Sequence, residues 1–237
     1  MALLAAMLQS AADAGTEPQS DCVVLLHGLA RTSRAMDDMA VALQQDGYRV
    51  ANISYPSREY PIEELAPMAI ESGLDECGDD APKVHFVTHS LGGILVRYYY
   101  EESDVGRIGR VVMLAPPNQG SKVADSLRDV PGFDWLNGPA GAQLGKGEGS
   151  VPLTLGVPEF EFAVIAGNRS IGPLSSAILD NPDDGKVSVE DTKLEGMRDF
   201  RLVEVSHAYI MQDDEVIGLV RRFLDTGSFG ELTDAAD

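Results

Sequence analysis

The chain has 237 residues, of which 44% are hydrophobic, and this composition suits a globular protein with one sizeable core. Acidic residues outnumber basic ones by 38 to 18, so the formal net charge is −20. This excess argues against a nucleic-acid partner and against anionic membrane surfaces, because both require clustered Lys and Arg. No apolar run approaches the ~20 residues that a membrane span needs. The charge is typical of a well-solvated surface, with adaptation to high salt as a sharper interpretation.

Residues 1–21 precede the first predicted strand. They are apolar and then rich in alanine, which resembles the end of a secretory signal, but no Lys or Arg occurs before Arg31. The positively charged start of such a signal is therefore missing. The segment is either a signal remnant, which implies a secreted or periplasmic protein, or a frayed terminus of a cytoplasmic one. Residues 22–237 are expected to form a single domain.

Six apolar runs predict strands, and helical patterns separate most of them. The predicted strands cover residues 22–26, 48–55, 84–87, 110–114, 162–167 and 200–205. Helices are predicted between Ser33 and Gly47, from Pro61 to Cys77, over 94–100 and over 215–223. This alternation predicts parallel β-α-β units. We therefore expect an α/β fold with about six parallel strands and helices on both faces.

Cys22 and Cys77 are the two cysteines of the chain. In an exported protein they could form one disulfide, and otherwise they are two unrelated free thiols. Neither a C-x-x-C nor an H-E-x-x-H pattern occurs. No metal site is expected.

A single serine lies in a tight turn after the third predicted strand, in the run THSLGG at residues 88–93. A serine between a strand and a helix resembles the nucleophile elbow of the α/β-hydrolases, in which the turn lifts the hydroxyl above the sheet. This resemblance implies that Ser90 is the nucleophile. Thr88 replaces the first glycine of the usual G-x-S-x-G pattern. The alternative is a serine that caps a helix and has no chemical role.

The first predicted strand runs into His27, Gly28 and Leu29. This arrangement resembles the oxyanion loop of the same family. The resemblance implies that the backbone N–H groups of Leu29 and Leu91 would bind an oxyanion beside the serine. For His27 we favour a structural role that holds the loop.

A serine nucleophile needs a histidine base, and the chain offers four candidates. His27 belongs to the first loop, His85 lies within a predicted strand, and His89 precedes Ser90 in the turn. Only His207 lies in a loop after a late strand. His207 is therefore the predicted base.

The triad acid of this fold lies between the nucleophile and the histidine in the chain. Residues 181–187 read NPDDGKV, in which Asp-Gly-x-Val resembles the acid loop of bacterial lipases. That resemblance selects Asp184, with Asp183 second and Glu190 a weak third. The alternative is a solvated acidic turn.

The loop after the fourth predicted strand, residues 115–121, resembles a loop that follows the corresponding strand in many lipases. Ligands of open α/β sheets bind at the carboxyl ends of the strands. Pro117, Asn118 and Gln119 are therefore expected to contact substrate.

Residues 130–159 are rich in Gly and Pro and interrupt the alternation. We expect an irregular, cap-like segment over the site, and a passive surface loop is the alternative. From loop position, Trp135, Leu136 and Tyr209 are expected to line an acyl pocket.

Together these motifs resemble the bacterial lipase and esterase branch of the α/β-hydrolases, in a minimal-core form, from about residue 22 to 223. The resemblance implies a serine carboxylic-ester hydrolase that acts on neutral acyl esters through an acyl-enzyme, without a cofactor. An acyltransferase or a thioesterase would use the same triad. A non-catalytic binding module on this scaffold is the alternative from a different class.

Overall fold

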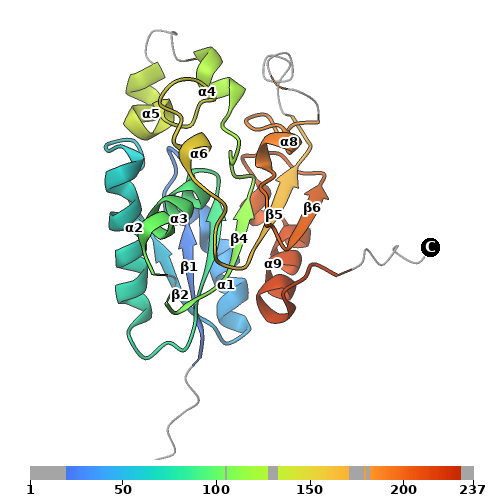
Figure 1. The fold of residues 1–237 in the computed structure, drawn as a ribbon. Helices are drawn as coiled ribbons and strands as arrows, with labels where there is room; N and C mark the ends of the chain where they lie inside the picture. Colours follow the sequence, from blue (N-terminus) through green and yellow to red (C-terminus); the bar gives the residue numbers. More distant parts are fainter. Residues whose placement is uncertain (1–19, 105, 128–132, 171–178, 180–181, 231–237) are drawn as a thin grey trace, which may run out of the picture.

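The structure is a computed structural model that describes residues 20–104, 106–127, 133–170, 179 and 182–230 (Figure 1). The predicted N-terminal segment therefore lies almost entirely outside the described residues. Six strands form one sheet in the order β2-β1-β3-β4-β5-β6, and all neighbours are parallel. The strands are β1 (Cys22–Leu26), β2 (Arg49–Ile53), β3 (Val84–His89), β4 (Ile108–Leu114), β5 (Phe162–Gly167) and β6 (Asp199–Val203). This sheet confirms the predicted α/β fold.

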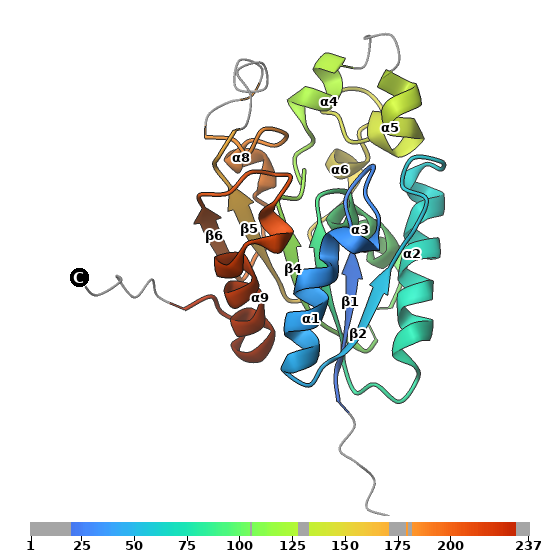
Figure 2. The ribbon, with the colours of Figure 1, turned by 180° about the vertical axis from the view of Figure 1, so that it is seen from behind.

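Helices cover both faces of the sheet. α2 (Ile62–Cys77) and α3 (Leu91–Glu102) lie on the face seen in Figure 1, and α1 (Asp37–Gln45) and α9 (Asp214–Thr226) lie on the other, seen in Figure 2. Each face has its own hydrophobic cluster, and β1 contributes alternate residues to the two. All five residues of β1 are consequently buried. A strand enclosed on both sides reads as a continuous apolar run, which is why the pattern was visible in the sequence.

Shorter helices join these main elements. They are η1 (Ser33–Met36), α4 (Lys122–Leu127), α5 (Phe133–Ala142), α6 (Val151–Thr154), α8 (Val189–Thr192) and η2 (Ile210–Gln212). α4 and α5 lie beyond the carboxyl ends of the strands (Figure 1). Two predicted helix starts were displaced, because Ser33 opens a 3-10 turn before α1 and Pro61 is the N-cap of α2 rather than its first residue.

The prediction of an irregular segment over residues 130–159 is wrong for 133–142 and 151–154, which form α5 and α6, while 143–150 and 155–159 contain no helix or strand. α5 contains a kink at Gly138, which has a φ of +66°. A Cβ at this position would lie 1.9 Å from the carbonyl oxygen of Arg58, so the helix packs on that loop through a bare glycine. Gly138 thus serves close packing and a break between two short helical pieces, whereas no described atom beyond its chain neighbours would lie within 4 Å of a Cβ at Gly149.

Cys22 and Cys77 form a disulfide, with their Cα atoms 5.7 Å apart. The bond joins the start of β1 to the end of α2. It therefore lies at the amino ends of the strands, opposite the edge of the sheet that carries Ser90.

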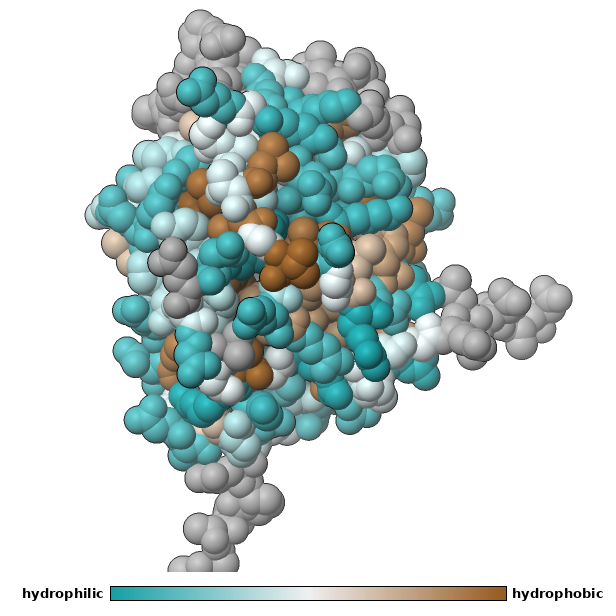
Figure 3. All heavy atoms as spheres, in the orientation of Figure 1, coloured by the Kyte–Doolittle hydropathy of each residue, from teal (hydrophilic) through white to brown (hydrophobic). Residues whose placement is uncertain are grey.

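The surface is predominantly hydrophilic, with apolar atoms gathered near the middle of one face (Figure 3). α6 and the segment after it expose Leu153 and Val157, about half of whose surface is accessible. Among the helices of the described residues, none has the length and hydropathy to cross a membrane.

Candidate active site

Ser90 is the single residue between the end of β3 and the start of α3. Its φ of +52° and ψ of −115° belong to neither element, and its N–H donates to the carbonyl oxygen of Leu114 on β4 at 2.9 Å. Ala30 and Ala115 are the other described non-glycine residues with positive φ. The three residues follow the neighbouring strands β3, β1 and β4, so backbone strain is concentrated at one edge of the sheet. Such strain persists only where the surrounding structure enforces it, and it is typical of functional sites.

The tight turn depends on two glycines of α3. A Cβ at Gly92 would lie 2.8 Å from the carbonyl oxygen of Leu26, and one at Gly93 would lie 3.3 Å from Oγ1 of Thr88. Thr88 is fully buried. A threonine is therefore accommodated at the usual glycine position because the residue that faces it, Gly93, has no side chain.

The buried Asp184 and the partly buried His207 form a pair at the carboxyl ends of β5 and β6. Nδ1 of His207 lies 2.7 Å from Oδ2 of Asp184, and the Asp184 side chain has no exposed surface. Oδ1 of Asp184 accepts the backbone N–H groups of Lys186 (2.9 Å) and Val187 (2.8 Å). The N–H of His207 donates to the carbonyl oxygen of Asp184 at 3.0 Å. These bonds hold a carboxylate in place against one nitrogen of the imidazole.

The two other candidate acids have different surroundings. Asp183 is also buried, but its Oδ1 accepts the N–H of Gly185 and its Oδ2 has no hydrogen-bond partner among the described residues. Glu190 is exposed on α8 and pairs with Lys193 at 2.6 Å. Of the three carboxylates, Asp184 is the one that contacts His207.

His207 lies beside the elbow. Its ring centroid is 4.8 Å from that of His89, the residue before Ser90, and Nε2 of His89 contacts the carbonyl oxygen of His207 at 3.0 Å. The hydroxyl of Ser90 makes no hydrogen bond to a described residue. In unliganded serine hydrolases the contact between serine and histidine is often long and shortens when substrate binds.

His27 holds the loop after β1, as the sequence predicted. Its ring stacks on Tyr55 with centroids 4.1 Å apart, and its Nε2 accepts the N–H of Tyr55 at 3.3 Å. Nδ1 therefore carries the proton and donates to the carbonyl oxygen of Gly28 at 2.8 Å. Burial lowers the pKa of His27, which keeps the ring neutral in this arrangement.

Tyr55 and Ser57 complete the support of this loop, and sequence reasoning missed both. The Tyr55 hydroxyl donates to the carbonyl oxygen of His27, and burial raises the pKa of Tyr55, so the hydroxyl keeps its proton. Oγ of Ser57 accepts the N–H of Ala30 at 3.0 Å. The parallel pairing of β1 with β2 places the two strand ends together. The sequence could indicate only that the first two strands are neighbours, and that does not specify the contacts of Tyr55 and Ser57.

Two backbone N–H groups remain available next to Ser90. No acceptor in the described part of the chain engages the N–H of Leu29 or that of Leu91, the first residue of α3. The two loops are in close contact, since a Cβ on Gly28 would lie 3.2 Å from Cβ of Ser90. Free donors near a serine at a helix N-terminus can stabilise negative charge that develops on a substrate oxygen.

The expected substrate contact of Asn118 is wrong. Asn118 is fully buried; its side chain donates to the carbonyl oxygen of Thr192 at 2.8 Å and accepts from Arg97 at 3.1 Å. Pro117 is buried as well, and Gln119 is half-buried with its side chain bonded to the carbonyl oxygen of Lys193. The polar side chains of this loop bond to the protein itself, because Arg97 is buried beneath the loop and donates to Asn118.

The other expected pocket residues are placed only in part. The side chains of Trp135 and Leu136 lie outside the described residues, although their backbone belongs to α5. Tyr209 is 59% exposed on the loop that follows His207. α5 reaches the loop after β1, because a Cβ at Gly141 would lie 3.2 Å from Cδ2 of Leu29. α5 therefore packs against the side chain of Leu29, the residue that carries one of the two free N–H donors.

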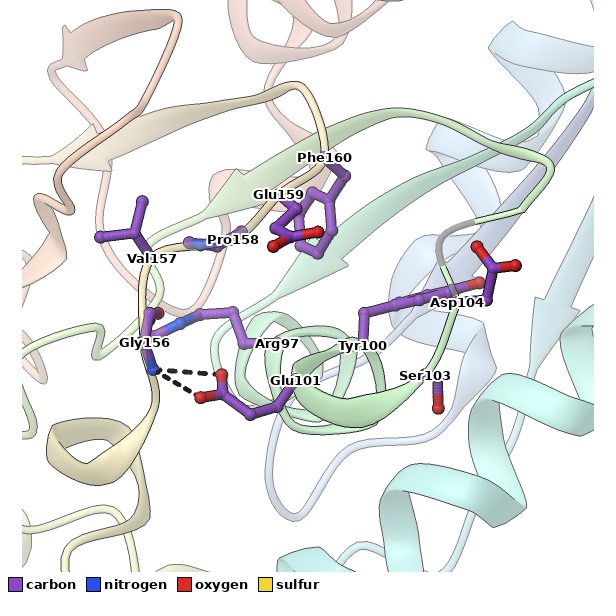
Figure 4. A pocket seen from close by; sticks show the side chains of 10 residues that line it. All are labelled: Arg97, Tyr100, Glu101, Ser103, Asp104, Gly156, Val157, Pro158, Glu159 and Phe160. Atoms are coloured by element: carbon purple, nitrogen blue, oxygen red, sulfur yellow. Dashed lines mark hydrogen bonds between the residues drawn. The ribbon is translucent and has the colours of Figure 1, made fainter.

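A hollow of about 420 Å³ lies elsewhere, between the second half of α3 and residues 156–160 (Figure 4). The carboxylate of Glu101 accepts the N–H of Gly156 across one side of it. Beneath it, Arg97 donates to the carbonyl oxygens of Pro152, Leu155 and Gly156, and burial lowers the pKa of Arg97 to about 10. None of Ser90, Asp184 and His207 lines this hollow.

Comparison with solved structures agrees with this fold. The fold resembles that of the mature Bacillus licheniformis lipase BlEst2, with a TM-score of 0.74, 20% identity and coverage of 88% of this chain and 93% of that one. A metagenomic carboxyl esterase, MGS0156, gives a TM-score of 0.59 at 18% identity, covering 81% of this chain and 66% of that one. Phospholipase PlaB from Legionella pneumophila gives 0.58 at 19% identity, covering 74% and 45%.

Comparison of the amino-acid sequence also identifies similar proteins. A stretch of 109 residues, 46% of the chain, is 33% identical to part of a hybrid PKS-NRPS synthetase, mycA, from Thermothelomyces thermophilus, and it spans 3% of that protein. The model of the alpha/beta hydrolase family matches residues 23–225, which include the strained serine, the buried carboxylate and the histidine described above. The chain therefore belongs to the α/β-hydrolase family.

Proposed function

We propose that this α/β hydrolase is a serine carboxylic-ester hydrolase, with Ser90 as nucleophile, His207 as base and Asp184 as the acid that orients it. The observation that carries the proposal is the contact at 2.7 Å between the buried Asp184 and His207, beside a serine held in a strained turn. A carboxylate, an imidazole and a hydroxyl in this order provide a general base for a nucleophile that is otherwise weak at neutral pH.

In the first half of the reaction, Nε2 of His207 takes the proton of Ser90 as Oγ attacks the ester carbonyl carbon. The carboxylate of Asp184 keeps the proton of His207 on Nδ1, so that Nε2 is free to accept, and it stabilises the imidazolium that forms. The N–H groups of Leu29 and Leu91 donate to the carbonyl oxygen as it becomes negative. Loss of one such donor typically costs about 10²–10³ in kcat.

In the second half, the imidazolium gives its proton to the departing alcohol and leaves an acyl group on Ser90. His207 then removes a proton from water, which attacks the acyl carbon, and the acid is released as Ser90 regains its proton. Asp184 remains ionised throughout. The two backbone N–H groups bonded to its Oδ1 keep it from rotating while the charge on His207 changes.

Neutral acyl esters are the proposed substrate class. The net charge of −20 disfavours strongly anionic substrates, because long-range repulsion lowers their rate of encounter. The names of the structural relatives, a lipase, a carboxyl esterase and a phospholipase, support ester hydrolysis as the reaction class.

The test is a series of p-nitrophenyl esters from acetate to palmitate, with Ser90→Ala beside the wild type. Ser72→Ala is the matched control, since Ser72 is exposed on α2 and its hydroxyl, within the described part of the chain, donates to the carbonyl oxygen of Met68 alone. We expect Ser90→Ala to lose at least about 10³-fold in kcat and Ser72→Ala to match the wild type. A fluorophosphonate probe should label the wild type at one site and leave Ser90→Ala unlabelled. Retention of most activity in Ser90→Ala would refute the assignment.

The same series separates the possible substrates. A maximum at short chains indicates an esterase with a shallow pocket, and a rise toward long chains indicates a lipase whose cap-like segment forms an acyl groove. Probe labelling without ester turnover would direct the search to thioesters or to acyl transfer, which use the same three residues. Neither labelling nor turnover would favour a non-catalytic module.

A further inference from the structure

His89 has no part in the reaction as described so far, yet it is the elbow residue that contacts His207 directly. It is 2% exposed, and its ring lies against that of His207 at an interplanar angle of 50°. Its Nε2 lies 3.0 Å from the carbonyl oxygen of His207, across a sequence separation of 118 residues. Among the described hydrogen bonds, this is the one that joins the elbow to the loop carrying His207.

This contact shows which nitrogen of the His89 ring carries a hydrogen. A carbonyl oxygen only accepts, so Nε2 of His89 must carry a hydrogen. Nδ1 of His89 is buried and has no partner among the described residues. It faces Gly28, where a Cβ would approach it to 2.6 Å.

Protonation of Nδ1 would create a buried cation with an unpaired donor. Burial lowers the pKa of His89 well below the usual histidine value, and the neighbouring His207, Arg31 and His27 lower it further. His89 thus presents a neutral N–H donor to His207, even when His207 becomes an imidazolium.

The position of His207 rests on a small number of bonds. Its N–H and its Nδ1 are both engaged by Asp184, through the carbonyl oxygen and the carboxylate respectively. Both bonds relate His207 to the acid, and neither relates it to the nucleophile. An exposed bond from Arg31 to the carbonyl oxygen of Ala208, at 3.2 Å, ties this loop to the loop after β1. The bond from His89, whose backbone adjoins Ser90, is the described bond that links His207 to the elbow itself.

We infer that His89 is a positioning residue of this site, which registers the base against the nucleophile by donating its Nε2–H to the carbonyl oxygen of His207 and packing against its ring. The inference rests on the proposed function for its effect on turnover. A displacement of the base by about 1 Å can cost about 10²-fold in rate, even when the chemical groups are unchanged.

Two amide substitutions test the donor. In His89→Gln the side-chain amide nitrogen can occupy the position of Nε2, and it restores the donor to His207. In His89→Asn the amide nitrogen falls near the position of Nδ1, where no acceptor lies. The variants are otherwise similar in polarity, which makes each the control of the other. His89→Leu, which removes both nitrogens, serves if His89→Asn does not fold.

We expect His89→Gln to stay within about 3-fold of the wild-type kcat on p-nitrophenyl butyrate, and His89→Asn to lose about 10–100-fold in kcat with KM changed less than about 2-fold. Thermal melting shows that each variant is folded at the assay temperature. A wild-type kcat in His89→Asn or His89→Leu would overturn the inference. So would equal losses in the Gln and Asn variants, because the donor would then not be the cause.

A second readout does not require turnover. The proton between Nδ1 of His207 and Asp184 should give a low-field ¹H resonance in the unliganded protein. We expect wild type and His89→Gln to show this resonance at the same position, and His89→Asn to shift, broaden or lose it. This pattern in a protein that hydrolyses no ester would retain the role of His89 and refute the proposed function. An unchanged resonance in His89→Asn would refute the role of His89.

Discussion

Replacement of Asp184 by asparagine tests how the buried carboxylate controls His207. Oδ1 of Asp184 accepts two backbone N–H groups, so the only oxygen of an asparagine side chain must take that position. The amide NH₂ group then faces Nδ1 of His207, where Oδ2 lies at 2.7 Å in the wild type. An NH₂ group donates, so Nδ1 becomes the acceptor and the proton moves to Nε2. The base can then no longer accept the proton of Ser90.

The expected loss in kcat is about 10³–10⁴-fold, the size seen when a triad aspartate is changed in this way. At 1.36 kcal/mol per tenfold change in rate, this corresponds to about 4–5 kcal/mol of transition-state stabilisation. KM should change little, because Asp184 has no exposed surface through which to touch substrate. Steady-state hydrolysis of p-nitrophenyl butyrate measures both constants, and thermal melting shows that the variant is folded.

Asp183→Asn is the matched control, since Asp183 is adjacent and equally buried but does not contact His207. We expect this variant to keep kcat within about 3-fold of the wild type, because no group near the base changes. If Asp184→Asn keeps more than about a tenth of the activity while Asp183→Asn loses it, the acid is Asp183 and the reasoning about tautomers is wrong.

Three further predictions concern stability. Changing both Cys22 and Cys77 to serine should lower the free energy of unfolding by about 4 kcal/mol, as for a loop closed across 55 residues, without changing kcat below the melting temperature. Urea denaturation measures the free energy of unfolding, and ester hydrolysis measures kcat. An unfolding free energy equal to that of the wild type would refute the stabilising role of the disulfide. Gly28→Ala places a Cβ 2.6 Å from Nδ1 of His89. We expect the free energy of unfolding to fall by about 1–3 kcal/mol and kcat/KM to decrease, and an unaltered midpoint of urea denaturation would contradict this. Because burial lowers the pKa of His27 and His89 in the folded state, the unfolded chain binds these protons first as the pH falls. Stability should therefore decrease below about pH 6.5, by at most ~1.4 kcal/mol per pH unit for each histidine, and urea curves at pH 7 and 5.5 that coincide would refute it.

The sequence by itself determined the sheet and the order of the chemical groups along it. Strands enclosed by helices on both faces are predominantly apolar, so β1 and β5 were recognisable as continuous apolar runs, and β3 as an apolar run interrupted by His85. A serine between such a strand and a helix, followed by glycines at positions 92 and 93, is typical of a nucleophile elbow. His207 could be selected as the candidate base by elimination, because His85 lies within a predicted strand and His27 and His89 lie in loops for which other roles were predicted. These inferences depend on local geometry, which residue type and spacing specify.

Only the tertiary structure decided which side chains meet. Asp183 and Asp184 are neighbours of the same type, and the conformation of their loop turns one toward His207 and the other away. Asn118 looked available in a loop at the carboxyl end of a strand, but Arg97 on α3 is buried beneath it. The bond from His89 to His207 spans 118 residues. Such contacts depend on how distant segments pack, because a side chain's partners are set by the space left between elements, and a pattern along the chain carries no measure of that space.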